Sequence, residues 1–135
     1  MKCRFCELSG NPEKCFPIFE SENVFAFLEK FPMNEGHLLV VPKKHVPDFE
    51  ELPEKEYSEL MRVCKNLSKV LKKEFKCKKV GMFIIGFDIP HTHIHLIPLH
   101  KQYYLDPTGK RTSSNNKLSS DENLETVQNR ILANF

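Results

Sequence analysis

Residues 91–97 constrain this chain most, because they place a histidine at every second position in the run His-Thr-His-Ile-His-Leu-Ile. In an extended strand, alternate side chains share a face. His91, His93 and His95 would then lie side by side, roughly 6.7 Å apart along the strand. The apolar residues between them would face the opposite side and enter a core. The run therefore predicts a strand with one face of imidazoles.

A row of imidazoles supports two chemistries, metal binding and phosphate chemistry. A neutral imidazole can attack phosphorus and form a covalent intermediate that water later cleaves, and neighbouring imidazoles can donate protons to the phosphate or the leaving group. His93 has a histidine on each side, so this geometry favours His93 as the attacking group. A histidine-rich surface strand without a function is the alternative. Burying three such side chains without partners would be costly.

The size and charge of the chain limit the kinds of partner. Its 135 residues suit one domain over residues 1–135 with a single core, and a net charge of +2 gives no support for a nucleic-acid partner. No apolar run approaches the roughly 20 residues that a membrane span needs. The chain has five cysteines, an odd number, and no apolar leader segment. Reduced thiols and a cytoplasmic location are therefore expected.

The order of predicted elements indicates an α+β fold. Strands are predicted over residues 15–19, 23–29, 37–41, 80–85 and 91–99. A long helix is predicted over residues 53–75, where Pro53 suits the first helical position and apolar residues recur at spacings of three and four. This order predicts a five-stranded antiparallel sheet with one long helix and one C-terminal helix.

The C-terminal part of the chain is predicted to stand apart from a core over residues 1–105. Residues 106–123 are rich in Ser, Asn, Pro and Gly, which is typical of a flexible loop. A last helix is expected to begin near Ser119, because Ser119 and Glu122 have the spacing of a capping box. The segment 106–135 is thus predicted to be a loop followed by a helix.

Several segments together resemble the histidine triad (HIT) superfamily of nucleotide-binding hydrolases and transferases. Besides the alternating histidines, they are Cys3-Arg-Phe-Cys6, Ala26-Phe27-Leu28-Glu29 and the run from Gly36 to His45. The resemblance implies a five-stranded antiparallel sheet with packed helices. It also implies hydrolysis of nucleoside phosphate derivatives at the α-phosphorus through a nucleotidyl-histidine. The substrates would be phosphoramidates, adenylates or dinucleoside polyphosphates.

The resemblance assigns roles to individual residues. His93 would become nucleotidylated, His95 would contact the phosphate and the leaving oxygen, and His37 would support the site from the adjoining strand. Glu29 lies where the family carries an aspartate that receives the ribose hydroxyls, and a carboxylate can accept two such hydrogen bonds. Two aromatic residues, Phe27 and Phe31, could form an apolar wall for a purine.

A zinc ion is expected from the N-terminal cysteine pair. Cys3 and Cys6 have the spacing that lets two thiolates bind one tetrahedral ion. In one branch of the family such a pair is completed by two histidines, which here are His45 and His91. Four protein ligands leave no open position, so this ion would be structural. The alternative is that both cysteines are free thiols.

One departure from the family pattern leaves the activity open. Many members carry a loop ending in Gly-Gln before the histidines, whereas this chain has Gly86-Phe87-Asp88, with Phe87 at the position of the glutamine. A phosphate donor is thereby lost. The alternatives are a non-catalytic nucleotide-binding or interaction module with structural zinc, a nucleotidyltransferase, and a zinc-dependent hydrolase. The resemblance further implies a homodimer that extends the sheet.

Overall fold

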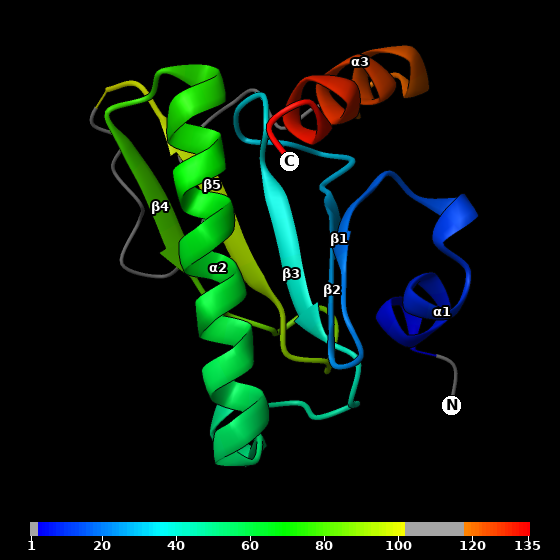
Figure 1. The fold of residues 1–135 in the computed structure, drawn as a ribbon. Coiled ribbons are helices and arrows are strands. Elements are labelled where there is room, and N and C mark those ends of the chain that lie inside the picture. Colours follow the sequence, from blue (N-terminus) through cyan, green and yellow to red (C-terminus); the bar gives the residue numbers. More distant parts are fainter. Residues whose placement is uncertain (1–2, 102–117) are drawn as a thin grey trace.

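A five-stranded antiparallel sheet forms the centre of the molecule (Figure 1). The computed structural model describes residues 3–101 and 118–135. The strands, in the spatial order β1-β2-β3-β5-β4, are β1 Pro17–Glu20, β2 Val24–Leu28, β3 Leu38–Pro42, β5 Ile94–Leu99 and β4 Lys79–Phe83. The predicted fold class is therefore confirmed, and β4 forms one edge of the sheet.

In the described part of the chain, three α-helices pack on this sheet: α1 Arg4–Gly10, α2 Glu54–Phe75 and α3 Asp121–Leu132. Two short 3-10 turns, Pro12–Lys14 and Phe49–Glu51, lie in the connections. Figure 1 shows α2 lying across the sheet and α1 beside β1 and β2. Among the described residues, none of these helices combines the length and apolar content that crossing a membrane requires.

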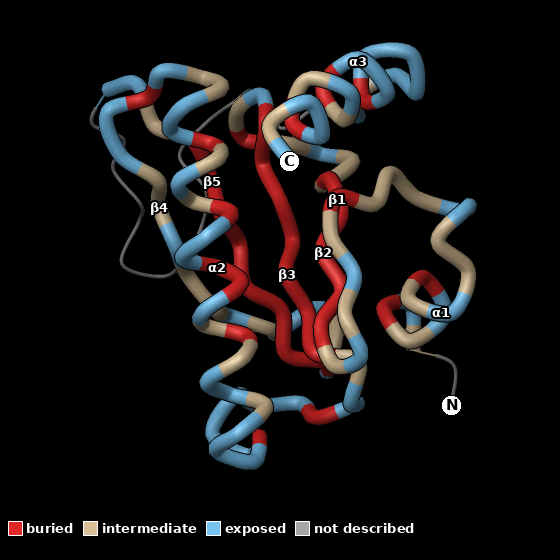
Figure 2. The backbone as a smooth tube through the Cα atoms, in the orientation of Figure 1, coloured by how far each residue is buried: buried red, intermediate tan, exposed pale blue. Residues whose placement is uncertain are grey.

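The central strands β2, β3 and β5 bury both of their faces, so the sheet carries two separate hydrophobic clusters. Figure 2 shows buried residues along β2, β3 and β5, and every residue of β2 and β3 is buried. One face packs against α2 and α3 through residues such as Ile94 and Leu96. The opposite face packs against Phe5 and Leu8 of α1. The helix α1 therefore covers the face opposite to α2.

The long helix α2 forms as its apolar pattern predicts. Leu60, Cys64, Leu67 and Leu71 are buried at spacings of three and four residues. Glutamates occupy its first turn and lysines its last turn, where each favours the helix dipole. This helix covers the sheet and contributes to the core.

The structure corrects several predicted boundaries. The histidine strand begins at Ile94, so His91 and His93 precede it. The short helix α1 was not predicted at all, because its seven residues carry no side-chain cap and no apolar repeat. The cap of α3 is Ser120, whose Oγ accepts a hydrogen bond from the Asn123 amide, and not Ser119.

The predicted flexible loop is tested only in part. Residues 106–117 of that loop lie outside the described residues. Its last positions are described, and α3 already begins at Asp121. The predicted C-terminal helix is thus present, and it packs on α2 and β1.

Candidate functional site

Three histidines lie close together on the face of the sheet that α1 covers. His95 belongs to β5 and pairs with Leu39 of β3 and Phe83 of β4. His37 immediately precedes β3, and its Nε2 lies 2.9 Å from Nδ1 of His95. The ring of His93 lies 5.2 Å from the ring of His95, measured between centroids. These three imidazoles are buried and adjoin one another.

His91 does not complete a ladder of three on one strand, so that prediction is wrong. Its Nε2 lies 2.8 Å from the carbonyl oxygen of Pro42, and a carbonyl can only accept, so Nε2 carries the proton. The Nδ1 lone pair of His91 consequently faces Cys3, Cys6 and His45. Burial is the main cause that lowers the pKa of His91, which favours the neutral imidazole that a metal requires.

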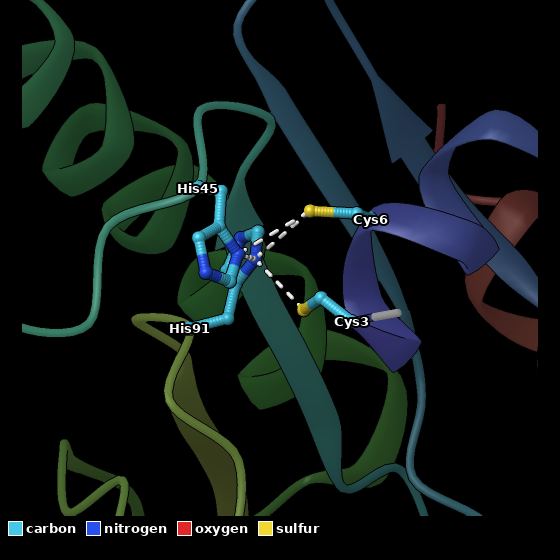
Figure 3. A group of neighbouring side chains, drawn as sticks. All are labelled: Cys3, Cys6, His45 and His91. Atoms are coloured by element: carbon cyan, nitrogen blue, oxygen red, sulfur yellow. Dashed lines mark hydrogen bonds between the residues drawn. The ribbon is translucent and has the colours of Figure 1, made fainter. Parts of the chain in front are cut away.

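Cys3, Cys6, His45 and His91 converge on one point between α1 and the sheet, as Figure 3 shows. Their ligand atoms all lie within 4.8 Å of one another. The Nδ1 of His91 lies 3.4 Å from the sulfur of Cys3, 3.5 Å from that of Cys6 and 3.2 Å from Nδ1 of His45. The single lone pair on Nδ1 of His91 cannot accept separate hydrogen bonds from all three neighbours.

These separations fit a tetrahedral zinc ion. Zn–S bonds of about 2.3 Å and Zn–N bonds of about 2.0 Å place neighbouring ligand atoms about 3.3–3.8 Å apart in a tetrahedral site. Burial raises the pKa of the Cys6 thiol, and neighbouring Cys3 raises it further. Two adjacent thiolates are therefore unfavourable without a cation, and a divalent ion would offset their charge. The four residues fit such an ion in type and in geometry.

The hydrogen bonds also determine where the proton of His93 lies. Its Nδ1 is 2.8 Å from the carbonyl oxygen of His91, so Nδ1–H must be the donor. In the neutral ring, Nε2 then carries a lone pair. This is the form of imidazole that can attack phosphorus.

The protons of His37 and His95 follow in the same way. The backbone amide of Met33 donates to Nδ1 of His37 at 3.1 Å, so the neutral His37 carries its proton on Nε2. That proton is donated to Nδ1 of His95. The neutral His95 therefore carries its own proton on Nε2. His93 and His95 thus present opposite forms, one with a lone pair on Nε2 and one with a hydrogen.

Glu29 lies beside this pair of histidines. One of its carboxylate oxygens lies within 4.8 Å of nitrogens of His37 and His95. Two histidines and a carboxylate could in principle hold a metal ion. A metal ion between His37 and His95 would need a lone pair from each ring. Here Nε2 of His37 carries a proton and donates it to Nδ1 of His95, so the two rings form a hydrogen bond. The Glu29 carboxylate also accepts a hydrogen bond from the Phe31 amide at 3.2 Å.

A pocket lies beside Phe5 and Glu29, and both of these residues adjoin the histidines. Most of its wall is apolar, with Glu29 and two basic residues as its charged groups. It is lined by Arg4, Phe5, Leu8, Cys15, Phe16, Phe27, Leu28, Glu29, Lys30, Leu39 and Ile89.

Comparison with known proteins identifies the family. Residues 11–102 match the HIT domain family model. The chain belongs to the HIT family. This HIT protein has a fold like that of a hypothetical histidine triad nucleotide-binding protein from Sulfolobus tokodaii. The TM-score is 0.82 at 30% identity, and the match covers 97% of this chain and 90% of that one.

Two further proteins are similar to this HIT protein, one in sequence and one in fold. An adenosine 5′-monophosphoramidase from Saccharomyces cerevisiae is 30% identical over 97 residues, which cover 71% of this chain and 61% of that one. A Zn-bound histidine triad family protein from Mycobacterium smegmatis has a TM-score of 0.75 at 21% identity, covering 98% and 92% of the two chains. At that identity the likeness shows the fold alone.

The structure brings most of the predicted site residues of this HIT protein together. The four predicted zinc ligands form one group, and the three predicted catalytic histidines, His37, His93 and His95, form another. Phe27 and Glu29 line the pocket, and their contacts with a nucleoside stay predictions. Phe31 does not line it, and its side chain is 45% exposed. The roles of these residues in catalysis stay predictions.

Two aromatic residues of the site were missed by the sequence analysis. The ring of Phe83 stacks on that of His95, with centroids 4.4 Å apart and an angle of 17° between the planes. The ring of Phe5 lies 4.9 Å from the ring of His93. Phe83 could have been found from strand register, because it pairs with His95. Phe5 has no comparable signal, since its position depends on α1.

Proposed function

We propose that this HIT protein hydrolyses nucleoside phosphate derivatives at the α-phosphorus through a nucleotidyl intermediate on His93. The observation that carries this proposal is the opposite protonation of two adjacent imidazoles. The lone pair on Nε2 of His93 suits a nucleophile. The hydrogen on Nε2 of His95 suits a hydrogen-bond donor to the phosphate oxygens and to the leaving atom.

In the first half-reaction, Nε2 of His93 attacks the α-phosphorus. A P–N bond forms as the bond from phosphorus to the leaving group breaks. The Nε2–H of His95 donates a hydrogen bond to the departing atom, which takes a proton from solvent water. The nucleotidylated imidazole of His93 is positive. The carbonyl of His91 continues to accept the Nδ1–H of His93 and stabilises that positive charge.

In the second half-reaction, water attacks the same phosphorus. The P–N bond to His93 breaks, the nucleoside monophosphate leaves, and the attacking water releases one proton to solvent, which balances the proton taken up in the first half-reaction. The hydrogen bond from His37 holds the His95 ring in one orientation through both steps. His37 is therefore proposed as a supporting residue, fixed in turn by the Met33 amide.

The pocket beside the histidines is proposed to hold the nucleoside. Phe5, Phe27 and Leu39 provide apolar surface against which a base can pack. Glu29 lies at the histidine side of this pocket and is proposed to accept hydrogen bonds from the ribose hydroxyls. Phosphoramidates are favoured as substrates by the relative in S. cerevisiae.

The cysteine and histidine group is proposed to hold structural zinc. Zinc bound to four protein ligands lends rigidity to the peptide around it and has no open position for water. The ligands would be Cys3, Cys6, His45 and His91. The distances between the cysteine sulfurs and the histidine nitrogens, and between the two histidine nitrogens, support this assignment. The unprotonated Nδ1 of His91 supports it as well.

The experiment that tests the function is a hydrolysis assay with adenosine phosphoramidate. The expected result is release of AMP by the purified protein and loss of that release in His93→Ala. A binding module with structural zinc would bind the nucleotide without releasing AMP. A nucleotidyltransferase would release AMP slowly, and addition of a phosphate acceptor would yield a new nucleotide. A zinc-dependent hydrolase would retain activity in His93→Ala.

A homodimer is proposed at the edge of the sheet. The edge strand β4 exposes backbone groups that a second copy could pair with. Apolar side chains are exposed there and in the following loop: Met82 is 50%, Ile85 45% and Phe87 92% exposed. Pairing of two β4 strands would bury these side chains and extend the sheet.

A further inference from the structure

Phe5 connects the metal-binding segment to the proposed nucleophile. It lies between Cys3 and Cys6 in the sequence, and its ring is 3% exposed. Its centroid lies 4.9 Å from that of His93 with an angle of 65° between the planes, and 5.9 Å from that of His91 with an angle of 88°. Both contacts have the edge-to-face geometry that aromatic pairs prefer.

A second connection runs through the backbone. The carbonyl of His91 accepts the hydrogen bond from Nδ1 of His93 at 2.8 Å. His91 is itself fixed by Pro42 through Nε2 and faces the cysteines through Nδ1. The Phe5 ring and the His91 carbonyl therefore both orient the His93 ring. Phe5 lies between the proposed metal ligands Cys3 and Cys6, and His91 is itself a proposed ligand.

The helix that carries Phe5 needs an anchor. Its seven residues are too few to form a stable helix alone, and its N-cap Cys3 makes no side-chain capping bond. Two of its side chains, Phe5 and Leu8, are buried against the sheet. A metal ion bound to Cys3 and Cys6 would hold this turn against His45 and His91.

We propose that the Cys3–Cys6 segment positions the nucleophile, with Phe5 as the positioning residue. A metal ion bound to Cys3, Cys6 and His91 would hold Phe5 against one side of the His93 ring and would hold the His91 carbonyl at the Nδ1–H of His93. Together they keep the lone pair of His93 on Nε2 and aim it at the phosphate site. This inference rests on the proposed function of His93, and it adds a task for the N-terminal segment beyond structural zinc binding.

The test compares Phe5→Leu with the matched variant Phe27→Leu in zinc-loaded protein. Both rings are 3% exposed and line the same pocket, while Phe27 packs against Phe5 and Phe25. Metal content, kcat, KM and the ¹⁵N NMR signals of the His93 ring are measured for each. Those signals distinguish a proton on Nδ1 from one on Nε2, whether or not the protein is active.

Phe5→Leu is expected to keep one zinc ion per chain, to lower kcat roughly tenfold and to give mixed forms of the His93 ring. Phe27→Leu is expected to raise KM and to leave the His93 signals as in the native protein. The inference is overturned if Phe5→Leu retains both the native kcat and the native His93 signals. It is also overturned if both variants change those signals equally.

Two further outcomes are covered by the same measurements. If the native protein releases no AMP, the proposed function fails, and the His93 signals alone then decide the positioning role. If Phe5→Leu does not fold, native protein stripped of metal replaces it. Mixed forms of His93 with retained β-sheet circular dichroism support the inference, and unchanged His93 signals contradict it.

Discussion

The chemistry of each histidine here depends on which backbone group its second nitrogen meets. A carbonyl at His93 Nδ1 leaves the lone pair on Nε2, whereas the Met33 amide at His37 passes a hydrogen onward to His95. Three identical side chains therefore carry three different proposed roles. Neither the spacing of the histidines nor their number contains this information.

Glu29 provides a prediction at the scale of one residue. In Glu29→Gln the side chain keeps its size and loses its charge, so it accepts hydrogen bonds from ribose less strongly. KM for adenosine phosphoramidate should rise roughly tenfold while kcat changes little, because a hydrogen bond to a charged group is lost. The 2′-deoxy substrate serves as a control and should lose less. An equal loss for both substrates would contradict the ribose assignment.

At the scale of elements, the short helix α1 is the part whose position depends most on the proposed ion. Chelation should release α1 from the sheet while β2 and β3, which are fully buried, stay folded. Hydrogen exchange followed by mass spectrometry should show faster exchange in residues 4–10 and unchanged exchange in β3. Unchanged protection of α1 after complete removal of the metal would contradict the structural role.

The helix α3 offers a second prediction with a neighbouring control. Ile131 is fully buried in the main core, and Leu132 beside it is 39% exposed. Ile131→Ala should lower the free energy of unfolding by about 2–4 kcal/mol, since it leaves a cavity. Leu132→Ala should lower it by less than about 1 kcal/mol. Urea unfolding of both variants checks this, and equal effects would show that α3 does not pack as described.

The sequence predicts the larger elements well because their patterns are local. The spacing of Leu60, Cys64, Leu67 and Leu71 predicts α2, and the apolar runs predict the strands. It fails at α1 and at the start of β5, where contacts distant in the sequence decide the structure. His91 leaves the strand pattern because it meets Pro42 and the cysteines. The proposed zinc ligands could be predicted only through family resemblance, since Cys3 and His91 are 88 positions apart.

At the scale of the whole molecule, the edge strand β4 determines the proposed assembly. The native protein should have twice the mass of one chain in light scattering. Met82→Lys places a charge on the exposed edge and should yield monomers, because edge lysines oppose strand pairing. Leu132→Lys introduces the same charge on α3 and should leave the mass unchanged. A native protein that is monomeric at all concentrations would contradict the dimer.

The whole molecule can be described as a sheet with different tasks on its two faces. One face builds the core with α2 and α3, and the other carries the histidines, the pocket and the metal group. The central claim is that His93 on this second face bonds to phosphorus. All other proposed roles, from Glu29 to the N-terminal cysteines, support that one step.

The most direct test is mass spectrometry of protein quenched during turnover of adenosine phosphoramidate. The expected result is an added adenylyl group on the peptide that contains His93, and its absence in His93→Ala. A protein that releases AMP without forming any adenylyl group on His93, or that forms it on another residue, would contradict the account.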